Sequence, residues 1–512
     1  MKSLDQLRRD AKALRKAHEA REPLALQRLK VHPPRSDGAV LKHADYLHVI
    51  AQETGFASWP ALKEALELQG LDRAAKLQQL KVALAHGQNA RVDRLLADTP
   101  DLADGVFGLQ VALLNREAVM TMLADDPGRA TRVTAHQSPL CFLAFSRRIH
   151  AEPDKADDML AIAEMLLAHG ADVNDGRPVS AESDHRLSVL YGAIGHADNM
   201  VLGQWLLDHE ADPNDGESLY HATELGHHDG LRMLLEAGAD PKGTNALLRA
   251  MDFHDHQAVW MLLDHGAQPD DFDGTHVGGE APWVVPALHQ AARRMCDAEM
   301  IALLLDAGAD PGRVYQGCTA YGYARVFGNA ALARAVEAQG AVPDLTQEEQ
   351  LLAQAADGDV PPGTYVDPAR LPEAYRNIIR QILHLPGKLA HVKRLVAMGV
   401  EYDRPDTEGL TPVQVAGWEG LPDMMGYLLT LRPDLSHVNG YGGTLLSTIL
   451  HGADNCPERA ERDYVGCLAL ALEQGVALPR AALDFADREE IAEFLADWAE
   501  AHPGQVVDYG AF

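Results

Sequence analysis

One short string of hydrophobic and polar residues returns many times along this chain. It joins two adjacent leucines to a Gly-Ala-Asp turn, as in Leu-Leu-Ala-His-Gly-Ala-Asp-Val-Asn at 166–174. Related strings stand at 206–214, 234–242, 262–270 and 304–312. The marker glycines, or Glu210 where glycine is replaced, are 40, 28, 28 and 42 residues apart. A period near 30 with insertions predicts a solenoid of stacked repeats.

The stretch 216–243 shows how one unit begins. Leu219, Ala222 and Leu225 recur with helical spacing and predict the buried face of a short first helix. Gly226 follows them and can adopt the left-handed backbone that ends a helix. Asp229 is then the predicted N-cap of a second helix.

The second helix of the same unit carries its apolar face at Leu231, Leu234 and Leu235. Gly238 is predicted to end it, and Pro241 prevents its continuation. Two helices this short cannot bury their own apolar faces, so each pair must stack on its neighbours. The pattern therefore predicts an all-α array of helix-turn-helix repeats.

Helix, glycine turn, helix, Leu-Leu and Gly-Ala-Asp in this order resemble the ankyrin repeat. The stretch Thr411-Pro412-Val413-Gln414-Val415-Ala416 resembles the start of that repeat, and Leu288-His289-Gln290-Ala291 matches it in part. The resemblance implies an ankyrin-repeat solenoid whose turns and helix faces form a concave groove. Groove surfaces of this kind commonly bind protein partners.

A narrower resemblance, to a bacterial group of ankyrin-repeat proteins of undefined activity, extends over most of the chain. It is carried by Gly-Phe-Ala-Ser-Trp-Pro-Ala-Leu-Lys at 55–63, Asn-Asp-Gly-Glu-Ser-Leu-Tyr-His-Ala at 214–222, Gly-Thr-Asn-Ala-Leu at 243–247 and Tyr-Gly-Gly-Thr-Leu-Leu at 441–446. This group implies a fold and no reaction.

Residues 1–74 do not follow the repeat and are expected to form a small helical domain. Leu4, Leu7, Ala11 and Leu14 mark a basic amphipathic first helix, and a second helix is expected from about Val40 to Glu53. The basic helix is open to three interpretations: a solvated face, a dock on the acidic repeats, or contact with nucleic acid. The following segments are degenerate repeats at 75–135, well-matched repeats at 136–344, repeats with insertions at 345–478 and a C-terminal helical cap at 479–512.

Charge narrows the range of partners. The 512 residues include 45 Lys plus Arg against 75 Asp plus Glu, a formal net charge of −30. Such a surface repels phosphate backbones, so we expect no nucleic-acid partner, and a protein or peptide partner could be basic. No apolar run reaches the length of a membrane span, so we expect no membrane partner.

Cysteine usage indicates the compartment. The five cysteines, Cys141, Cys296, Cys318, Cys456 and Cys467, are scattered and form no Cys-x-x-Cys motif. Such a set favours reduced thiols, and the first residues lack the apolar core of a signal peptide. We therefore expect a cytoplasmic protein.

Candidate binding residues cluster at the start of one well-matched repeat. They are Asn214, Asp215, Glu217, Tyr220, His221 and Asn245. In the ankyrin alignment His221 faces the groove, and Glu217 could face it as well. The group could contact a peptide or ligand, or stabilise the local turns. A carboxylate, a phenol and an imidazole could also perform acid/base chemistry, so a small-molecule or catalytic site around Glu217, Tyr220 and His221 is the alternative function. Insertions before 174, near 271–284 and at 359–364 could enclose such a site.

The 24 histidines invite a metal interpretation, but the repeat period argues against it. His228 and His256 are 28 residues apart, which is the local period, so they should occupy equivalent helix junctions. The recurring Asp of Gly-Ala-Asp is expected to bond backbone N–H groups of its own turn. We expect no metal site and no cofactor. The leading hypothesis is a protein-interaction scaffold, not an enzyme.

Overall fold

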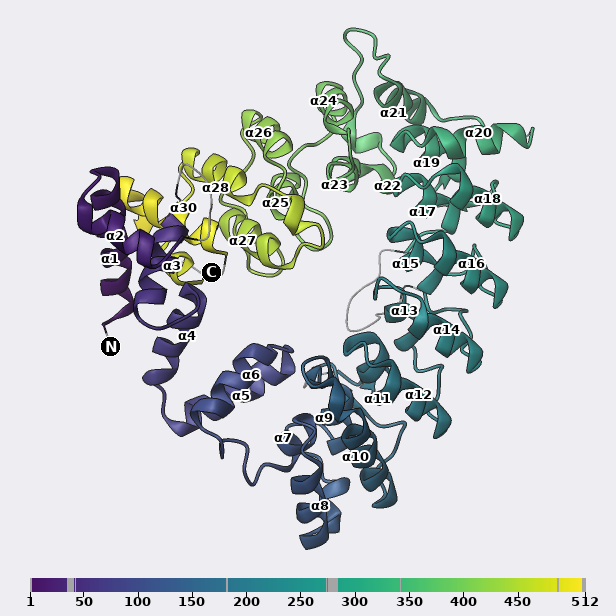
Figure 1. Ribbon diagram of the computed structural model, residues 1–512. Helices are drawn as coiled ribbons and strands as arrows, with labels where there is room; N and C mark the ends of the chain where they lie inside the picture. Colours follow the sequence, from purple (N-terminus) through teal and green to yellow (C-terminus); the bar gives the residue numbers. More distant parts are fainter. Residues whose placement is uncertain are drawn as a thin grey trace. The chain divides into compact units, whose positions relative to one another are not determined.

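The computed structural model describes residues 2–34, 41, 43–180, 183–272, 274, 284–340, 342–485 and 488–508. These residues divide into two compact units, 71–344 and the pair of segments 1–70 and 345–512. The fold is mostly helical, and its few strands form short two-stranded pairs (Figure 1). The predicted all-α class is therefore confirmed, and the predicted segment boundaries stay a prediction.

Unit 71–344 is a stack of helix pairs (Figure 1). Its helices are α5 Arg73–Ala85, α6 Asn89–Asp98, α7 Phe107–Ala112, α8 Arg116–Asp125, η1 Pro127–Ala130, α9 Pro139–Ala144, η2 Arg148–His150, η3 Pro153–Lys155, α10 Ala156–Ala168, α11 Val189–Tyr191, η4 Gly192–His196, α12 Met200–Asp208, α13 Ser218–Ala222, α14 Asp229–Glu236, α15 Ala246–Asp252, α16 His256–Asp264, α17 Ala287–Arg293, α18 Ala298–Asp306, α19 Ala320–Phe327 and α20 Ala330–Ala338. Strands β1 Gly176–Pro178 and β2 Arg186–Ser188 form one hairpin, and β3 Val314–Tyr315 and β4 Cys318–Thr319 form another.

The helices of this unit pack in two rows. The first helices of successive repeats are in contact along α13, α15, α17 and α19, and the second helices along α12, α14, α16, α18 and α20. The predicted leucines Leu231, Leu234 and Leu235 are buried between these rows. The stacking is the packing that the string of paired leucines predicts.

Details of the 216–243 unit differ from the sequence prediction. The first helix ends at Ala222, so Leu225 lies beyond it. The second helix begins at Asp229 itself, and its N-cap is His228, whose side chain makes no capping hydrogen bond. The prediction that Asp229 is the N-cap is therefore wrong by one residue. Gly238 does adopt the predicted left-handed backbone, with a φ of 92°.

The Asp of each Gly-Ala-Asp turn bonds its own turn as predicted. Asp212 Oδ1 accepts from Asn214 N at 2.9 Å, and Asp240 Oδ1 accepts from Lys242 N at 3.0 Å. Asp310 Oδ1 accepts from Gly312 N at 2.8 Å. These carboxylates therefore stabilise their own turns.

The histidines at the repeat junctions are also structural. His228 Nε2 lies 2.8 Å from Asp255 Oδ2, and His256 Nε2 lies 2.9 Å from Asp297 Oδ1. Asp255 and Asp297 are the N-caps of α16 and α18, and each accepts a backbone N–H of its helix. Each histidine thus links its repeat to the helix start of the next one, as the 28-residue spacing predicts.

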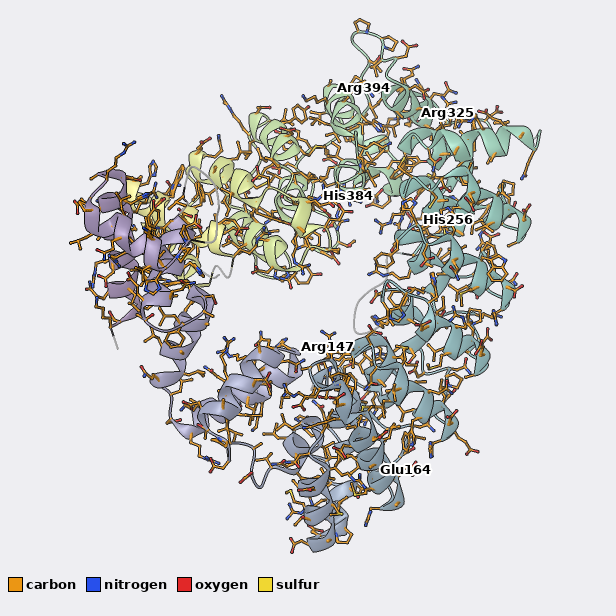
Figure 2. The ribbon with its side chains drawn as sticks, in the orientation of Figure 1. Arg147, Glu164, His256, Arg325, His384 and Arg394 are labelled. Carbon is orange, nitrogen blue, oxygen red and sulfur yellow. The ribbon has the colours of Figure 1, made fainter. Side chains whose placement is uncertain are left out.

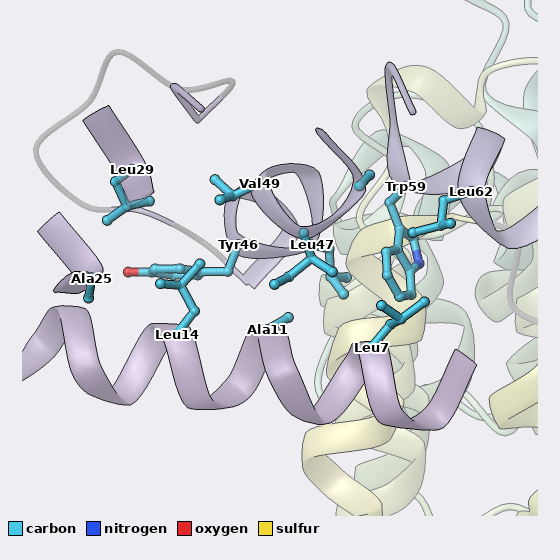
Figure 3. Packing of buried hydrophobic residues seen from close by; sticks show 12 residues of the cluster. Leu7, Ala11, Leu14, Ala25, Leu29, Tyr46, Leu47, Val49, Trp59 and Leu62 are labelled. Atoms are coloured by element: carbon cyan, nitrogen blue, oxygen red, sulfur yellow. The ribbon is translucent and has the colours of Figure 1, made fainter. Parts of the chain in front are cut away.

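The second unit begins with α1 Leu4–Glu19, α2 Pro23–Val31, α3 His43–Glu53 and α4 Trp59–Gln69. Leu7, Ala11 and Leu14 lie on one side of α1 and pack against residues of the following helices (Figure 3). The basic amphipathic helix is therefore confirmed. The predicted start of the second helix, Val40, lies outside the described residues.

The rest of this unit is a second helical stack (Figure 1). It contains α21 Gln347–Asp357, η5 Pro368–Arg370, α22 Glu373–Arg376, α23 Ile378–Ile382, α24 Leu389–Ala397, α25 Pro412–Trp418, α26 Pro422–Thr430, α27 Leu445–Asn455, η6 Arg459–Glu461, α28 Tyr464–Glu473, α29 Arg480–Phe485, α30 Glu489–Ala501 and η7 Pro503–Gln505, with the parallel pair β5 Leu478–Pro479 and β6 Val506–Val507. The insertion 359–364 lies between α21 and η5, whereas most of 271–284 lies outside the described residues.

The basic N-terminal helix docks within its own unit. Helix α3 packs on α30, Lys12 Nζ lies 2.7 Å from Glu500 Oε2, and Arg15 Nη1 lies 3.9 Å from Glu493 Oε1. An intramolecular dock was one of the three interpretations of its positive charge, but it was expected on the acidic repeats. It forms on the acidic terminal helix.

The junction contacts yield a stability prediction. Asp255→Ala removes both the cap of Ala258 N, at 2.9 Å, and the partner of His228. We expect a loss of about 1–2 kcal/mol in the free energy of unfolding, measured from the urea midpoint of the full chain. The matched control is Asp264→Ala, an exposed carboxylate at the opposite end of α16, which should change stability by less than about 0.5 kcal/mol. Equal losses in both variants would contradict the linking role.

Candidate functional site

The six predicted site residues divide into turn residues and helix residues. Asn214 belongs to the turns: its Oδ1 accepts from Asp240 N, at 2.7 Å, in the next repeat. Asn174 bonds Asp212 N in the same way, also at 2.7 Å. Asn214 thus links its turn to the turn of the next repeat, as Asn174 does one repeat earlier.

Asp215 positions the start of α13. One carboxylate oxygen accepts from the backbone N–H groups of Glu217, at 2.9 Å, and Ser218, at 2.7 Å. The other oxygen accepts from the hydroxyls of Ser218, at 2.6 Å, and Ser188. Asn245 is the N-cap of α15, the position that Glu217 holds before α13, and it is buried with a left-handed backbone at a φ of 59°. Both residues shape the helix starts.

Glu217 is a buried carboxylate, only 1% exposed. Its Oε1 accepts a hydrogen bond from His185 Nε2, and its Oε2 lies 3.4 Å from His221 Nε2. His185 comes from the segment that leads into β2, 32 residues earlier in the chain. The carboxylate is therefore held between two imidazoles.

His221 lies between two carboxylates. Its Nδ1 is 2.8 Å from Glu224 Oε2, and its Nε2 faces Glu217. Burial lowers the pKa of His221, but Glu217 and Glu224 raise it by more, to about 9. The imidazole is therefore protonated at neutral pH and has no lone pair with which to accept a proton.

The ion pairs continue into the next two repeats. Glu224 Oε1 accepts from Arg249 Nε at 2.7 Å, and Arg249 Nη1 lies 3.3 Å from Asp252 Oδ2. Asp252 Oδ1 accepts from Arg294 Nε at 2.7 Å. Charges alternate from His221 to Arg294 along the first-helix row. We call this set, from His185 to Arg294, the first-helix ion network.

The sequence prediction missed His185, Glu224, Arg249, Asp252 and Arg294. A periodic signal could have found part of the network, because His221 and Arg249 are 28 residues apart, as are Glu224 and Asp252. Equivalent positions of adjacent repeats face each other when the first helices stack. His185 has no such signal, since it comes from the hairpin.

A glycine brings the helices of the network close together. A Cβ added at Gly195 would lie 2.8 Å from the Cβ of His221 and 2.7 Å from the Tyr191 ring. Only glycine therefore allows η4 to approach α13 this closely. The Tyr191 ring consequently packs on His221, with 4.8 Å between the centroids.

Aromatic rings cover the middle of the network. The Arg249 guanidinium lies 5.7 Å from the ring centre of Tyr220 and 4.9 Å from that of Phe253. Tyr220 also packs edge-on against His221, at 5.1 Å. Phe253 is 46% exposed, so this aromatic cover reaches the surface of the repeats.

The described residues contain neither a candidate metal site nor a helix that could span a membrane. Among them, no group of three His, Cys, Asp or Glu side chains could hold a metal ion. No helix in the described ranges is long and apolar enough to cross a membrane. The five cysteines are all buried, and no disulfide links them.

The protonated imidazole predicts a pH dependence. Because the folded pKa of His221 lies above the ordinary 6.5, its contribution to stability is full below about pH 6.5 and is lost as the pH rises through 9. The stability difference between wild type and His221→Gln should therefore shrink by about 2–3 kcal/mol between pH 6 and 9.5. The measurement is the urea midpoint of the full chain at each pH.

Leu219→Ala is the control for this titration. It removes a buried side chain from the same helix without changing a charge. Its difference from wild type should be the same at both pH values. A difference for His221→Gln that also stays constant would exclude a protonated His221.

Comparison with known proteins identifies the repeats. Residues 190–273 match the model of ankyrin repeats in three copies. The ankyrin repeat domain of human ASB11 is similar to this chain at 22% identity, with a TM-score of 0.35, and the match covers 47% of this chain and 100% of that one. No curated protein matches. The matched residues span η4 to α16 and include most of the first-helix ion network, so this part of the chain consists of ankyrin repeats.

Proposed function

We propose that this protein is an interaction scaffold that binds a protein or peptide partner along the first helices of residues 189–327. The observation that carries the proposal is the aromatic and arginine surface of Tyr220, Arg249 and Phe253 above the first-helix ion network. Tyrosine and arginine are enriched among the residues that dominate binding energies at protein interfaces. The groove predicted from sequence would have this row as its wall.

The ion network prepares this surface for binding. Arg249 is held by Glu224 on one side and Asp252 on the other, and it lies against two aromatic rings. Its side chain is therefore ordered before any partner arrives. A side chain that is already ordered loses less conformational entropy on binding, which favours affinity.

The two rows of helices differ in charge. In the first helices α13, α15, α17 and α19, the only acidic residue is Asp252. The second helices α10, α12, α14, α16, α18 and α20 carry ten acidic residues: Asp157, Asp158, Glu164, Asp208, Asp229, Glu236, Asp264, Glu299, Asp306 and Glu337. The charge argument for a basic partner thus applies to the second helices, and a partner on the first helices need not be basic.

The alternative, a small-molecule or catalytic site at Glu217, Tyr220 and His221, has less support from the geometry. General base catalysis needs an imidazole with a free lone pair, and His221 is paired on both nitrogens. The Glu217 side chain has no exposed surface with which to meet a ligand. These contacts favour a structural role for both side chains.

Photo-crosslinking tests the scaffold. With p-benzoylphenylalanine in place of Phe253, we expect protein adducts from the cell lysate that Arg249→Ala reduces at least threefold. The matched control carries the same group at Ala302, which is exposed on α18 in the second-helix row. Adducts of the same identity and yield from both positions, or none from position 253, would count against a partner on the first helices.

A further inference from the structure

One half-buried arginine of unit 71–344 stands apart from the others. Arg177 lies on β1, with its Cζ 4.1 Å from the centre of the Phe145 ring. Its Nε is buried and has no hydrogen-bond partner among the described residues. Arg249 and Arg294, by contrast, each bond a carboxylate at 2.7 Å. In a chain with 75 acidic side chains, a half-buried cation that has no carboxylate partner among the described residues calls for an explanation.

Two further polar side chains surround the same ring. The centroid of Phe145 lies 5.9 Å from that of Tyr191 and 5.3 Å from that of His196. Across the described part of the chain, neither the Tyr191 hydroxyl nor the His196 ring makes a hydrogen bond. We call Phe145, Arg177, Tyr191 and His196 the Arg177 cluster. Its members come from α9, β1, α11 and η4, so three separate polar groups converge on one aromatic ring.

Burial sets the protonation of the cluster. It raises the pKa of Tyr191 to about 12 and, together with the charges of Arg147 and Arg177, lowers the pKa of His196 to about 4. At neutral pH the phenol is a hydrogen-bond donor and the imidazole is neutral. Arg177 therefore supplies the only charge within the cluster.

A second arginine reinforces the positive charge. Arg147 is exposed (Figure 2). Its Nε and Nη2 donate to the backbone oxygen of His196 at 2.9 and 2.7 Å. Its guanidinium is thereby held beside the cluster by a neutral carbonyl, which leaves its charge in place. Two guanidinium groups thus flank the cluster, although the chain as a whole is acidic.

We propose that the Arg177 cluster binds a carboxylate carried on an apolar or aromatic body. The planar fork of a guanidinium matches the two oxygens of a carboxylate, and a phenol can add a third hydrogen bond. The rings of Phe145 and Tyr191 supply the apolar contact. This site does not depend on the scaffold proposal.

A purely structural contact between Arg177 and Phe145, with no ligand, explains fewer of these observations than a binding site does. A cation–π contact accounts for the position of the guanidinium over the ring. It does not account for the buried Nε without a hydrogen-bond partner among the described residues, or for the convergence of Tyr191 and His196 on the same ring. A bound carboxylate would engage these groups and neutralise the charge.

A doubly charged phosphate fits less well. The carboxylates of Glu217 and Glu224 lie close enough to Tyr191 to raise the pKa of its hydroxyl. Their field repels a dianion more strongly than a monoanion. The cluster therefore selects a single negative charge.

Arginine modification tests the proposal on the full chain. Phenylglyoxal labels accessible guanidinium groups, and mass spectrometry measures the rate at each arginine. At constant ionic strength, benzoate should slow the labelling of Arg177 at least threefold, whereas the neutral isostere benzamide should not. Arg232, exposed and paired with Asp229 at 3.1 Å, is the internal control and should react at one rate with both compounds.

Three outcomes would overturn the site. They are equal labelling of Arg177 in benzoate and benzamide, equal protection of Arg232, and protection by inorganic phosphate as strong as by benzoate. Tyr191→Phe keeps the ring and removes the hydroxyl, and it should reduce the benzoate protection at least twofold. The control Tyr315→Phe, whose hydroxyl bonds Val284 O at 3.3 Å, should leave the protection unchanged. Equal protection in all three proteins would remove the hydroxyl from the site.

A further variant shows whether the carboxylate belongs to a protein partner or to a free ligand. Arg177→Ala in the protein that carries the crosslinker at position 253 distinguishes two cases, provided that benzoate protects Arg177 in the parent. Loss of the adducts means that the protein partner supplies the carboxylate. Retention of the adducts means that a free carboxylate is the ligand. A failed scaffold, with no adducts at all, leaves the labelling result intact.

Discussion

Stacking of helix pairs is the constraint on which the rest of this structure depends. A pair such as α13 and α14, with five and eight residues, cannot enclose the side chains of Leu231 and Leu234 by itself. The neighbouring pairs complete the enclosure, so every repeat derives its stability from the next one. Polar side chains at the junctions must then find partners in another repeat or remain unpaired in a region that excludes water.

The first-helix ion network meets this requirement with charges. Glu217 is too deeply buried to be hydrated and His221 is only partly exposed, and each is paired with at least one oppositely charged or hydrogen-bonding group. Such networks contribute little over an apolar replacement, yet the loss of one member is costly because its partner stays buried and unpaired. The network therefore fixes the register of adjacent repeats more than it adds to their stability. That fixed register orders Arg249 and Phe253 at the surface.

The second unit also pairs opposite charges, between its first and last helices. Helix α30 presents acidic side chains to the basic helix α1, and α3 covers part of its apolar face. The exposed ion pairs contribute little energy by themselves. They place the positive side chains of α1 next to the negative side chains of α30. The apolar contact of α30 comes from the buried Leu495 and Ile491.

Sequence alone predicts what is local and what repeats. The left-handed Gly238 and the turn carboxylate of Asp240 follow from the chemistry of a few adjacent residues, and the contact of His228 with the next repeat follows from the period. The burial of Glu217 could not be predicted, because it depends on a histidine 32 residues away in a hairpin. The N-cap was placed one residue too late, at Asp229, because Asp229 is already the first residue of the helix and His228 holds the cap position.

The difference between Arg249 and Arg177 shows where function can enter such a scaffold. Both guanidinium groups lie over aromatic rings of the same unit. Arg249 is neutralised by carboxylates from its own and the preceding repeat, so in the proposed scaffold it would contribute shape and order. Arg177 comes from a hairpin outside the repeat period, and the described residues leave its charge uncompensated. Periodic positions are committed to stacking, since a change in one repeat disturbs its neighbours. A residue outside the period is free of that constraint, and its charge can therefore be reserved for a ligand.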